Sequence, residues 1–67
     1  MPLGSVRINS ERLRTLRISA ALSHQELAKR CGISRQTSTR IEALGVAMPS
    51  TIERIAAVLG VETEVLL

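Results

Sequence analysis

The sequence predicts an all-α domain, a compact bundle of about five short helices. Three observations support this class. First, the chain of 67 residues is 45% hydrophobic but has no Phe, Tyr or Trp, so its core must be built from small aliphatic side chains, which favour helices. Second, apolar residues recur at helical spacing along the chain. Third, residues that cap helix N-termini precede these apolar stripes, and a glycine directly follows two of them.

The length allows one domain with a marginal core, because a chain of this size buries only about 60% of its unfolded surface. We assign residues 7–67 to the domain and expect residues 1–6 to be a disordered N-terminus or a remnant of cloning. The single cysteine, Cys31, excludes an intrachain disulfide, and one cysteine with one histidine cannot form a zinc site. We therefore predict no metal and no cofactor. No apolar run is long enough to span a membrane, no signal peptide is visible, and a lone thiol suits the cytoplasm.

Charge is distributed unevenly along the chain, whose net charge is +3. Residues 7–40 contain eight basic and two acidic residues, whereas residues 41–67 contain one basic and four acidic residues. A basic half joined to a mildly acidic half indicates a face for a polyanion, although an ordinary solvated surface explains the charges equally well. The absence of aromatic residues argues against single-stranded nucleic acids, whose bases usually stack on aromatic side chains.

The first predicted helix spans about residues 10–20. Asn9 or Ser10 can cap its N-terminus through a side-chain oxygen. Leu13 and Leu16 begin an apolar stripe along one face of this helix.

Two further helices are joined by a tight turn. Ser23 and Glu26 have the spacing of a capping box at the start of the second helix. Gly32 follows this helix directly, as expected for a residue in the left-handed conformation. Ser34 then caps the third helix. Two short helices with a glycine in the turn form a helix-turn-helix, here at about residues 24–43.

The remainder of the chain predicts two more helices. Residues 43–48 read as an apolar loop. Ser50 is expected to cap the fourth helix, with Glu53 completing a second capping box, and Gly60 is expected to end it. A short fifth helix follows Glu62. Five helices leave no room for a sheet.

At this point the chain resembles the Cro/C1-type (XRE-like) helix-turn-helix DNA-binding family, whose familiar members are phage repressors. The resemblance covers about residues 11–66. The matching segments are Leu13–Arg17, Leu22–Ala28, Cys31–Gln36, Arg40–Glu42, Pro49–Ser50 and Ala57–Val61. It implies a lambda-repressor-like bundle and a cytoplasmic, bacterial or phage-encoded transcriptional regulator. Such a regulator binds double-stranded DNA in a sequence-specific way, as a homodimer, with the third helix in the major groove.

The third helix would supply the side chains that read base pairs. By helix phase Ser38 and Ile41 point inward, which directs the intervening positions outward. The expected base contacts are Arg35, Gln36, Thr39 and Arg40. An arginine can pair with guanine through two hydrogen bonds and a glutamine with adenine, although each arginine could instead bind phosphate or remain solvated.

The resemblance also implies roles for residues that flank this helix. Ser23, His24 and Ser34 are expected to contact phosphates, because backbone N–H groups at helix N-termini suit an anion. The family usually has Gln where His24 stands, and an ordinary exposed histidine is the plainer alternative. Arg17 and Glu42 match a structural ion pair that ties the first helix to the end of the third.

Three features depart from the family pattern. Ala21 stands where the family usually has Gly, so a left-handed backbone there would cost about 1–2 kcal/mol, and the first helix could end in another way. Ser38 replaces a usual Ile or Val, and its hydroxyl can bond back to a preceding carbonyl of its own helix, but apolar burial is lost. Residues 43–48 form a loop one residue longer than usual, without the basic residues that touch phosphate in relatives.

Two surfaces could meet a protein partner. The expected dimer interface, with closure of the core as the alternative role, is Val61, Val65, Leu66 and Leu67. The second hypothesis for the function is a protein-interaction module on the same fold, such as an antitoxin-like or polymerase-contacting subunit. Its expected contacts are Val46, Ala47 and Met48. An enzyme is not predicted, because the sequence offers no nucleophile–base set, phosphate loop, metal cluster or paired carboxylates.

Overall fold

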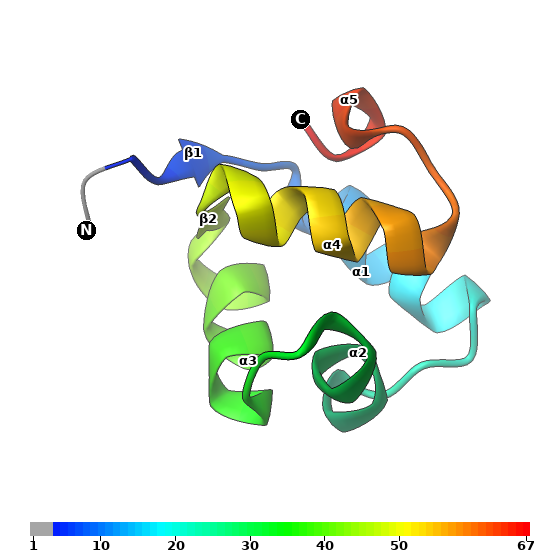
Figure 1. Ribbon diagram of the computed structural model, residues 1–67. Coiled ribbons are helices and arrows are strands. Elements are labelled where there is room, and N and C mark those ends of the chain that lie inside the picture. The colour runs from blue at the N-terminus through cyan, green and yellow to red at the C-terminus, as the bar shows by residue number, and fades with distance from the viewer. Residues whose placement is uncertain (1–3) are drawn as a thin grey trace.

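The computed structural model describes residues 4–67 (Figure 1). Its elements are β1 (Val6–Arg7), α1 (Ser10–Ser19), α2 (His24–Cys31), α3 (Arg35–Leu44), β2 (Val46–Ala47), α4 (Pro49–Leu59) and α5 (Thr63–Leu66). In Figure 1, α4 crosses the middle of the molecule, with α2 and α3 on one side and α5 on the other. The prediction of a bundle of about five short helices is confirmed. No helix in the described part is long and apolar enough to cross a membrane.

The first three helices begin with the cap residues that the sequence predicts. Asn9, Ser23 and Ser34 each have an extended backbone, and each side-chain oxygen accepts a hydrogen bond from the backbone N–H three residues further on. The three distances are 3.0, 3.1 and 3.0 Å. Gly32 ends α2 in the left-handed conformation, with φ of 72°. The turn between α2 and α3 is therefore set by local sequence.

The start of α4 differs from the prediction. Ser50 does not cap this helix, and the second capping box with Glu53 is wrong. Met48 occupies the N-cap position without a side-chain hydrogen bond, and Pro49 is the first helical residue. Proline suits that position because its φ is already helical and its missing N–H would have had no partner within the helix.

The expectation that no sheet would form is also wrong. β1 and β2 pair antiparallel, with Val6 opposite Ala47. Gly45 makes this possible, because its φ of 70° ends α3 and turns the chain back toward β1. A Cβ at Gly45 would lie 2.7 Å from Oγ of Ser10, so a side chain would not fit without a shift.

The pairing of β1 with β2 extends the folded domain beyond the expected boundary at residue 7. Val6 belongs to the fold, although it lies within the segment 1–6 that we set apart from the domain. Residues 1–3 of that segment lie outside the described residues. In the pair of strands β1 and β2, Ala47 is buried and belongs to the hydrophobic core. The segment 43–48, which was expected to be an irregular loop, therefore contributes to the core.

The core is aliphatic, as the composition requires. Its most deeply buried large side chains come from four different helices: Leu13, Leu27, Ile55 and Leu66. Leu66 is only 1% exposed, and its carbonyl accepts a hydrogen bond of 2.7 Å from the backbone N–H of Asn9. Leu66 therefore closes the core, and its assignment to a dimer interface is wrong.

The exit from α1 is strained. Ala21 has φ of 58°, the single positive φ of a non-glycine residue in the described part of the chain. This conformation lets the backbone N–H of Leu22 bond to the carbonyl of Arg17 at 3.0 Å, and it directs Leu22 into the core. Helix 1 thus ends in the left-handed way that glycine favours, without the glycine.

Candidate nucleic-acid interface

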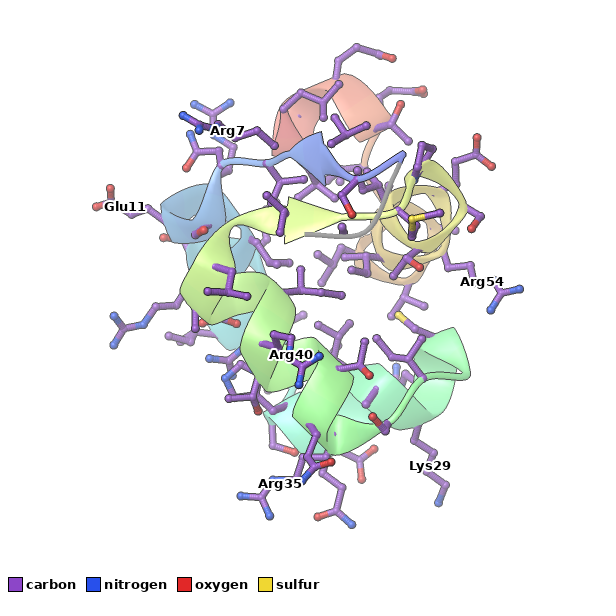
Figure 2. All side chains as sticks on the ribbon, turned by 90° about the vertical axis from the view of Figure 1, so that its left-hand side faces the viewer. Arg7, Glu11, Lys29, Arg35, Arg40 and Arg54 are labelled. Atoms are coloured by element: carbon purple, nitrogen blue, oxygen red, sulfur yellow. The ribbon has the colours of Figure 1, made fainter. Side chains whose placement is uncertain are left out.

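The outward face of α3 presents a row of polar side chains. Ser38 and Ile41 are buried, as helix phase predicts. The exposed row consists of Arg35, Gln36, Thr39 and Arg40. These four side chains and Ala43 line a shallow hollow of about 480 Å³. Figure 2 views this face and shows Arg35 and Arg40 at different levels of the helix.

The two arginines of this row carry charge without a protein partner. No ion pair among residues 4–67 includes Arg35 or Arg40. A guanidinium has five N–H donors in a fixed plane, which suits paired acceptors such as N7 and O6 of guanine. Both side chains are therefore available to an anionic or acceptor-rich ligand.

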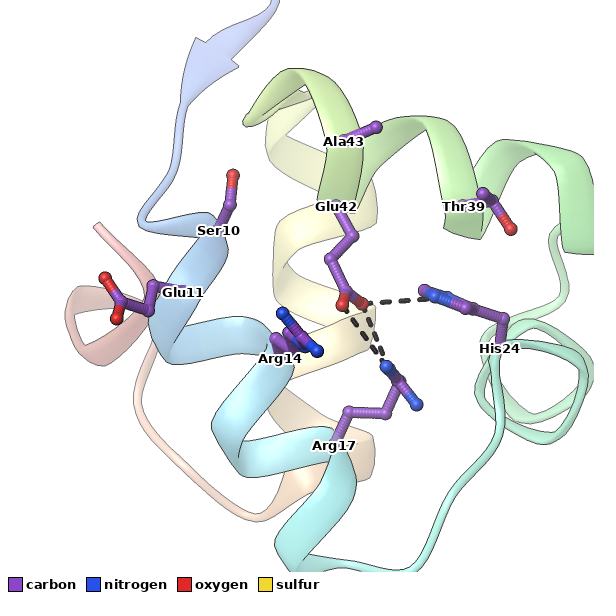
Figure 3. A pocket seen from close by; sticks show the side chains of 8 residues that line it. All are labelled: Ser10, Glu11, Arg14, Arg17, His24, Thr39, Glu42 and Ala43. Carbon is purple, nitrogen blue, oxygen red and sulfur yellow. Dashed lines mark hydrogen bonds and ion pairs between the residues drawn. The ribbon is translucent and has the colours of Figure 1, made fainter.

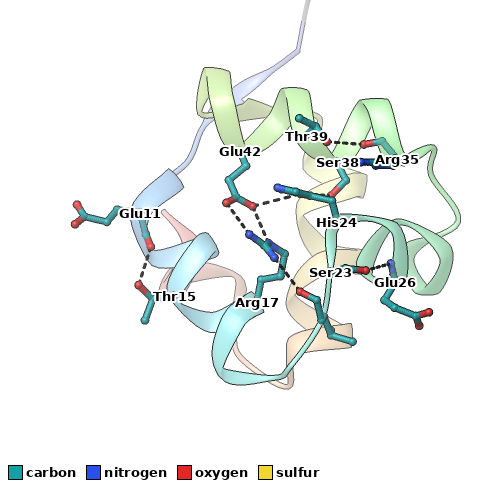
Figure 4. Close-up of polar contacts among 11 residues, drawn as sticks. Glu11, Thr15, Arg17, Ser23, His24, Glu26, Arg35, Ser38, Thr39 and Glu42 are labelled. Atoms are coloured by element: carbon teal, nitrogen blue, oxygen red, sulfur yellow. Dashed lines mark hydrogen bonds and ion pairs between the residues drawn. The ribbon is translucent and has the colours of Figure 1, made fainter.

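Thr39 offers less hydrogen bonding than the sequence suggested. Its hydroxyl donates to the carbonyl of Arg35 at 3.0 Å, within the same helix (Figure 4). The hydroxyl proton is therefore engaged, and what remains for a ligand is an acceptor oxygen and a methyl group. A methyl group suits apolar contact with the methyl of thymine.

A second hollow of about 320 Å³ lies at the N-terminus of α2. It is lined by Arg17, Ser23, His24, Gln25 and Arg35. The hydroxyl of Ser23 accepts the hydrogen bond that caps α2, which leaves its proton free to donate. Backbone N–H groups at a helix N-terminus together with arginine side chains suit a phosphate.

Ser34 lies at the equivalent end of α3 but is more fully engaged. Its Oγ caps the helix and lies 2.8 Å from Oγ1 of Thr37. Ser34 is exposed.

Arg17 and Glu42 meet between α1 and α3. Their two contacts are 3.0 Å from Nε to Oε2 and 3.2 Å from Nη2 to Oε1, and each side chain is only 12% exposed. Nη1 of Arg17 also donates to the carbonyl of Leu22 at 2.9 Å. The guanidinium therefore connects α1, α3 and the segment before α2, and Figure 3 shows its contacts with Glu42.

His24 is not an ordinary exposed histidine. Its Nδ1 lies 3.3 Å from Oγ of Ser38 and 3.6 Å from Oε2 of Glu42 (Figure 4). The Ser38 hydroxyl, which could have bonded back to a carbonyl of its own helix, meets the imidazole instead. An Ile or Val at position 38 would lack the oxygen that the ring meets.

A cleft of about 580 Å³ separates the start of α1 from α3. Its lining residues are Ser10, Glu11, Arg14, Arg17, His24, Thr39, Glu42 and Ala43. Because Thr39 and Ala43 also line the hollow over α3, the cleft continues the outward face of that helix. Figure 3 shows Arg14 and Arg17 on α1 across the cleft from α3.

Two of the three residues expected to meet a partner keep an accessible side chain. Ala47 is buried in the core, so its assignment to a partner surface is wrong. Val46 is half-buried, and Met48 is 42% exposed. Val46, Met48 and Leu44, which is 65% exposed, line a mainly apolar hollow of about 450 Å³ beside Arg40.

Comparison with known proteins shows the family of this chain. The model of a helix-turn-helix domain family matches residues 10–67. The chain belongs to this family. The resemblance noted from the sequence is thereby confirmed. None of the functionally curated protein sequences is significantly similar to this helix-turn-helix domain.

Two solved structures resemble the domain over most of its length. One is the master regulator for biofilm formation SinR, in complex with DNA. It is 26% identical with a TM-score of 0.81, over 88% of this chain and 100% of that chain. The other is described as a hypothetical transcription factor, NHTF, from Neisseria. It is 26% identical with a TM-score of 0.74, over 98% of this chain and 84% of that chain.

Cys31 lies away from the polar face of the helix-turn-helix domain. Burial raises the pKa of its thiol, an effect that the nearby charge of Arg54 partly opposes. The thiol is therefore held in its neutral, unreactive form. Within residues 4–67, no group of three metal-ligating side chains comes together.

Sequence reasoning missed the contact between His24 and the two α3 residues. The family pattern places a phosphate contact at position 24, which concerns only the outer side of the ring. The signal that could have found the contact is the coincidence of two departures, a histidine at position 24 and a small hydroxyl residue at position 38. The two unusual residues, His24 on α2 and Ser38 on α3, meet where these helices pack against each other.

Proposed function

We propose that this chain is a sequence-specific regulator of transcription that binds double-stranded DNA as a homodimer, with α3 in the major groove. The observation that carries the proposal is the exposed row on α3, whose two arginines form no ion pair with any of residues 4–67. The family membership and the likeness to SinR, described in complex with DNA, support it. The proposal includes no catalytic step.

The four side chains of the row would have different partners. Arg35 and Arg40 are suited to guanine, and Gln36 to adenine, through paired hydrogen bonds in the major groove. Thr39 would contact a thymine methyl, because its hydroxyl proton is already engaged within α3. Ser23, His24 and Ser34 would contact the phosphates on either side and so fix the register of α3.

A dimer is proposed because a single recognition helix reads only a few base pairs. Two copies related by a two-fold axis would read half-sites about 34 Å apart, one turn of DNA. With Leu66 withdrawn to the core, the remaining candidates for the interface are Val61 and Val65, which are half-buried, and the exposed Leu67. Such a dimer would act in the cytoplasm of a bacterium or as a phage-encoded protein, and occlusion of its site would make it a repressor.

The test is selective retention of DNA. The protein is titrated with random and genomic duplex fragments at two salt concentrations, and bound fragments are sequenced. We expect enrichment of one palindromic site, and a steep loss of affinity with salt because phosphate contacts release counterions. Absence of binding to any duplex at low salt would overturn the proposal.

The apolar hollow favours a second candidate function, contact with a protein such as a toxin or RNA polymerase. Leu44 and Met48 are large apolar side chains that remain exposed beside the exposed row on α3, which we call the reading face. Binding of purified bacterial RNA polymerase by the wild type, lost in a Leu44→Gln/Met48→Gln variant that still binds DNA, would support this function. Equal binding of RNA polymerase by the wild type and the variant would rule out the apolar hollow as the contact site.

A further inference from the structure

His24 reaches from α2 across to α3. It is the only histidine in the chain and the first residue of α2. One ring nitrogen, Nδ1, faces the protein, where Oγ of Ser38 and Oε2 of Glu42 lie 3.3 and 3.6 Å away. The inner side of the ring is therefore anchored on α3 (Figure 4).

The other ring nitrogen, Nε2, faces solvent. It has no hydrogen bond to the described residues, whose buried polar side-chain atoms all have a partner, so Nε2 cannot be buried. The side chain as a whole is 27% exposed. It also lines both the hollow at the start of α2 and the cleft between α1 and α3. The outer nitrogen thus lies where the proposed function puts a DNA phosphate.

We propose that His24 binds this phosphate in its protonated form, so that DNA binding takes up a proton. The inference rests on the proposed function and couples the uptake of a proton to DNA binding. A neutral imidazole has one N–H donor. If that donor is Nδ1–H toward Glu42, Nε2 presents a lone pair to the phosphate. If it is Nε2–H, Nδ1 can accept a hydrogen bond from the hydroxyl of Ser38 at 3.3 Å, but its lone pair then also faces the Glu42 carboxylate at 3.6 Å. Only the imidazolium donates on both sides.

The charges around the ring explain why DNA would supply the driving force. The charged residues that line the same cleft or hollow are Arg14 and Arg17 on α1, Arg35 and Glu42 on α3, and Glu11, which lies at the far end of the cleft from His24 (Figure 3). Glu42 favours the imidazolium, but its charge is already offset by Arg17 at 3.0 Å. The remaining arginines oppose protonation. A phosphate at Nε2 would add the negative charge that this balance lacks, so the complex would hold the proton more tightly than the free protein.

The sign of the pH effect follows from this linkage. DNA affinity should be highest at low pH and should fall as the pH rises through the range in which a histidine titrates. One proton allows at most a tenfold change in affinity per pH unit, and we expect a total fall of about three- to tenfold between about pH 5.5 and 7.5. The chain has no other histidine, and burial raises the pKa of the Cys31 thiol further from this window.

The experiment measures binding of a fluorescently labelled duplex of about 20 base pairs and arbitrary sequence, at low salt, as a function of pH. The key variant is His24→Gln, which keeps an N–H donor but cannot titrate. Wild type should lose affinity as pH rises, and His24→Gln should bind with an affinity that changes by less than about 1.5-fold over the same range.

A second measurement keeps the test independent of how the variant folds. The ring protons of His24 are followed by NMR in the wild type, with and without the duplex. We expect the midpoint of their titration to move to higher pH when DNA is added. An unmoved midpoint, or the same pH dependence in folded His24→Gln, would overturn the inference while leaving DNA binding intact. Absence of DNA binding at every pH would overturn the proposed function, and this inference with it.

Discussion

Arg17 on α1 and Glu42 on α3 form a two-pronged ion pair, with contacts of 3.0 and 3.2 Å between residues that are 25 positions apart. Both side chains are only 12% exposed, and the pair joins α1 to the last turns of α3. Both residues also line the cleft that continues the outward face of α3 (Figure 3). A contact that joins two helices of the scaffold therefore also lines a cleft at the surface of the molecule.

Replacement of Arg17 should destabilise the fold. Arg17→Ala leaves the Glu42 carboxylate buried without its partner, and it removes the hydrogen bond to the carbonyl of Leu22. We expect a loss of about 3 kcal/mol in the free energy of unfolding, measured by chemical denaturation, together with a lower melting temperature. Loss of DNA binding with unchanged melting would show instead that Arg17 is a DNA contact.

Arg14 offers a matched control one turn earlier on the same helix. It is exposed, and no ion pair in the described part of the chain includes it. Arg14→Ala removes the same charge and should change stability by less than about 0.5 kcal/mol. Equal losses for both variants would mean that general charge, rather than the pair with Glu42, accounts for the effect.

A single substitution at the end of α1 should stabilise the protein. Ala21 holds a left-handed backbone with φ of 58°, which is costly for a residue with a Cβ. Ala21→Gly should raise the free energy of unfolding by about 1 kcal/mol. Ala20→Gly is the control, because Ala20 has φ of −84° and gains nothing from glycine. Similar shifts in melting temperature for both variants would count against backbone strain at position 21.

Local rules predicted those features whose cause lies within a few residues. Asn9, Ser23 and Ser34 cap their helices through the N–H three positions on, so short sequence patterns suffice. At the start of α4 two local rules competed. A serine at position 50 favours a cap there, but Pro49 fits the first helical position, and the proline prevails.

The rest depends on contacts between distant segments. The strands β1 and β2 are two residues long, too short for an alternating pattern, and they pair across about forty residues of chain. The contact of His24 with Ser38 likewise joins two helices. The exposed row on α3 could be predicted because helix phase alone determines which side chains point outward. The contacts beside this row join different helices, so they became visible only in the folded structure.

The reading face predicts a base-specific loss. Arg40→Ala should reduce affinity for the selected DNA site by about 1–3 kcal/mol and relax the preference at one base pair. Arg54→Ala, an equal change of charge on α4, lies away from this face (Figure 2) and should have a much smaller effect. The measurement is binding of each variant to the preferred site and to its single-base substitutions. A uniform loss on every sequence would make Arg40 a phosphate contact.

The buried thiol predicts how stability changes at alkaline pH. Burial raises the pKa of Cys31 above its ordinary value, so the folded state resists ionisation that the unfolded chain undergoes freely. The stabilisation from the neutral thiol is complete below the ordinary thiol pKa, and it is lost as pH rises from there through the raised pKa. The melting temperature of wild type should therefore fall over this alkaline range, and Cys31→Ala, although less stable at neutral pH, should show a shallower fall.

The same burial predicts the reactivity of the thiol. A disulfide-exchange reagent should label Cys31 slowly in the native protein and rapidly in denaturant. Rapid labelling under native conditions would contradict the burial on which both expectations depend.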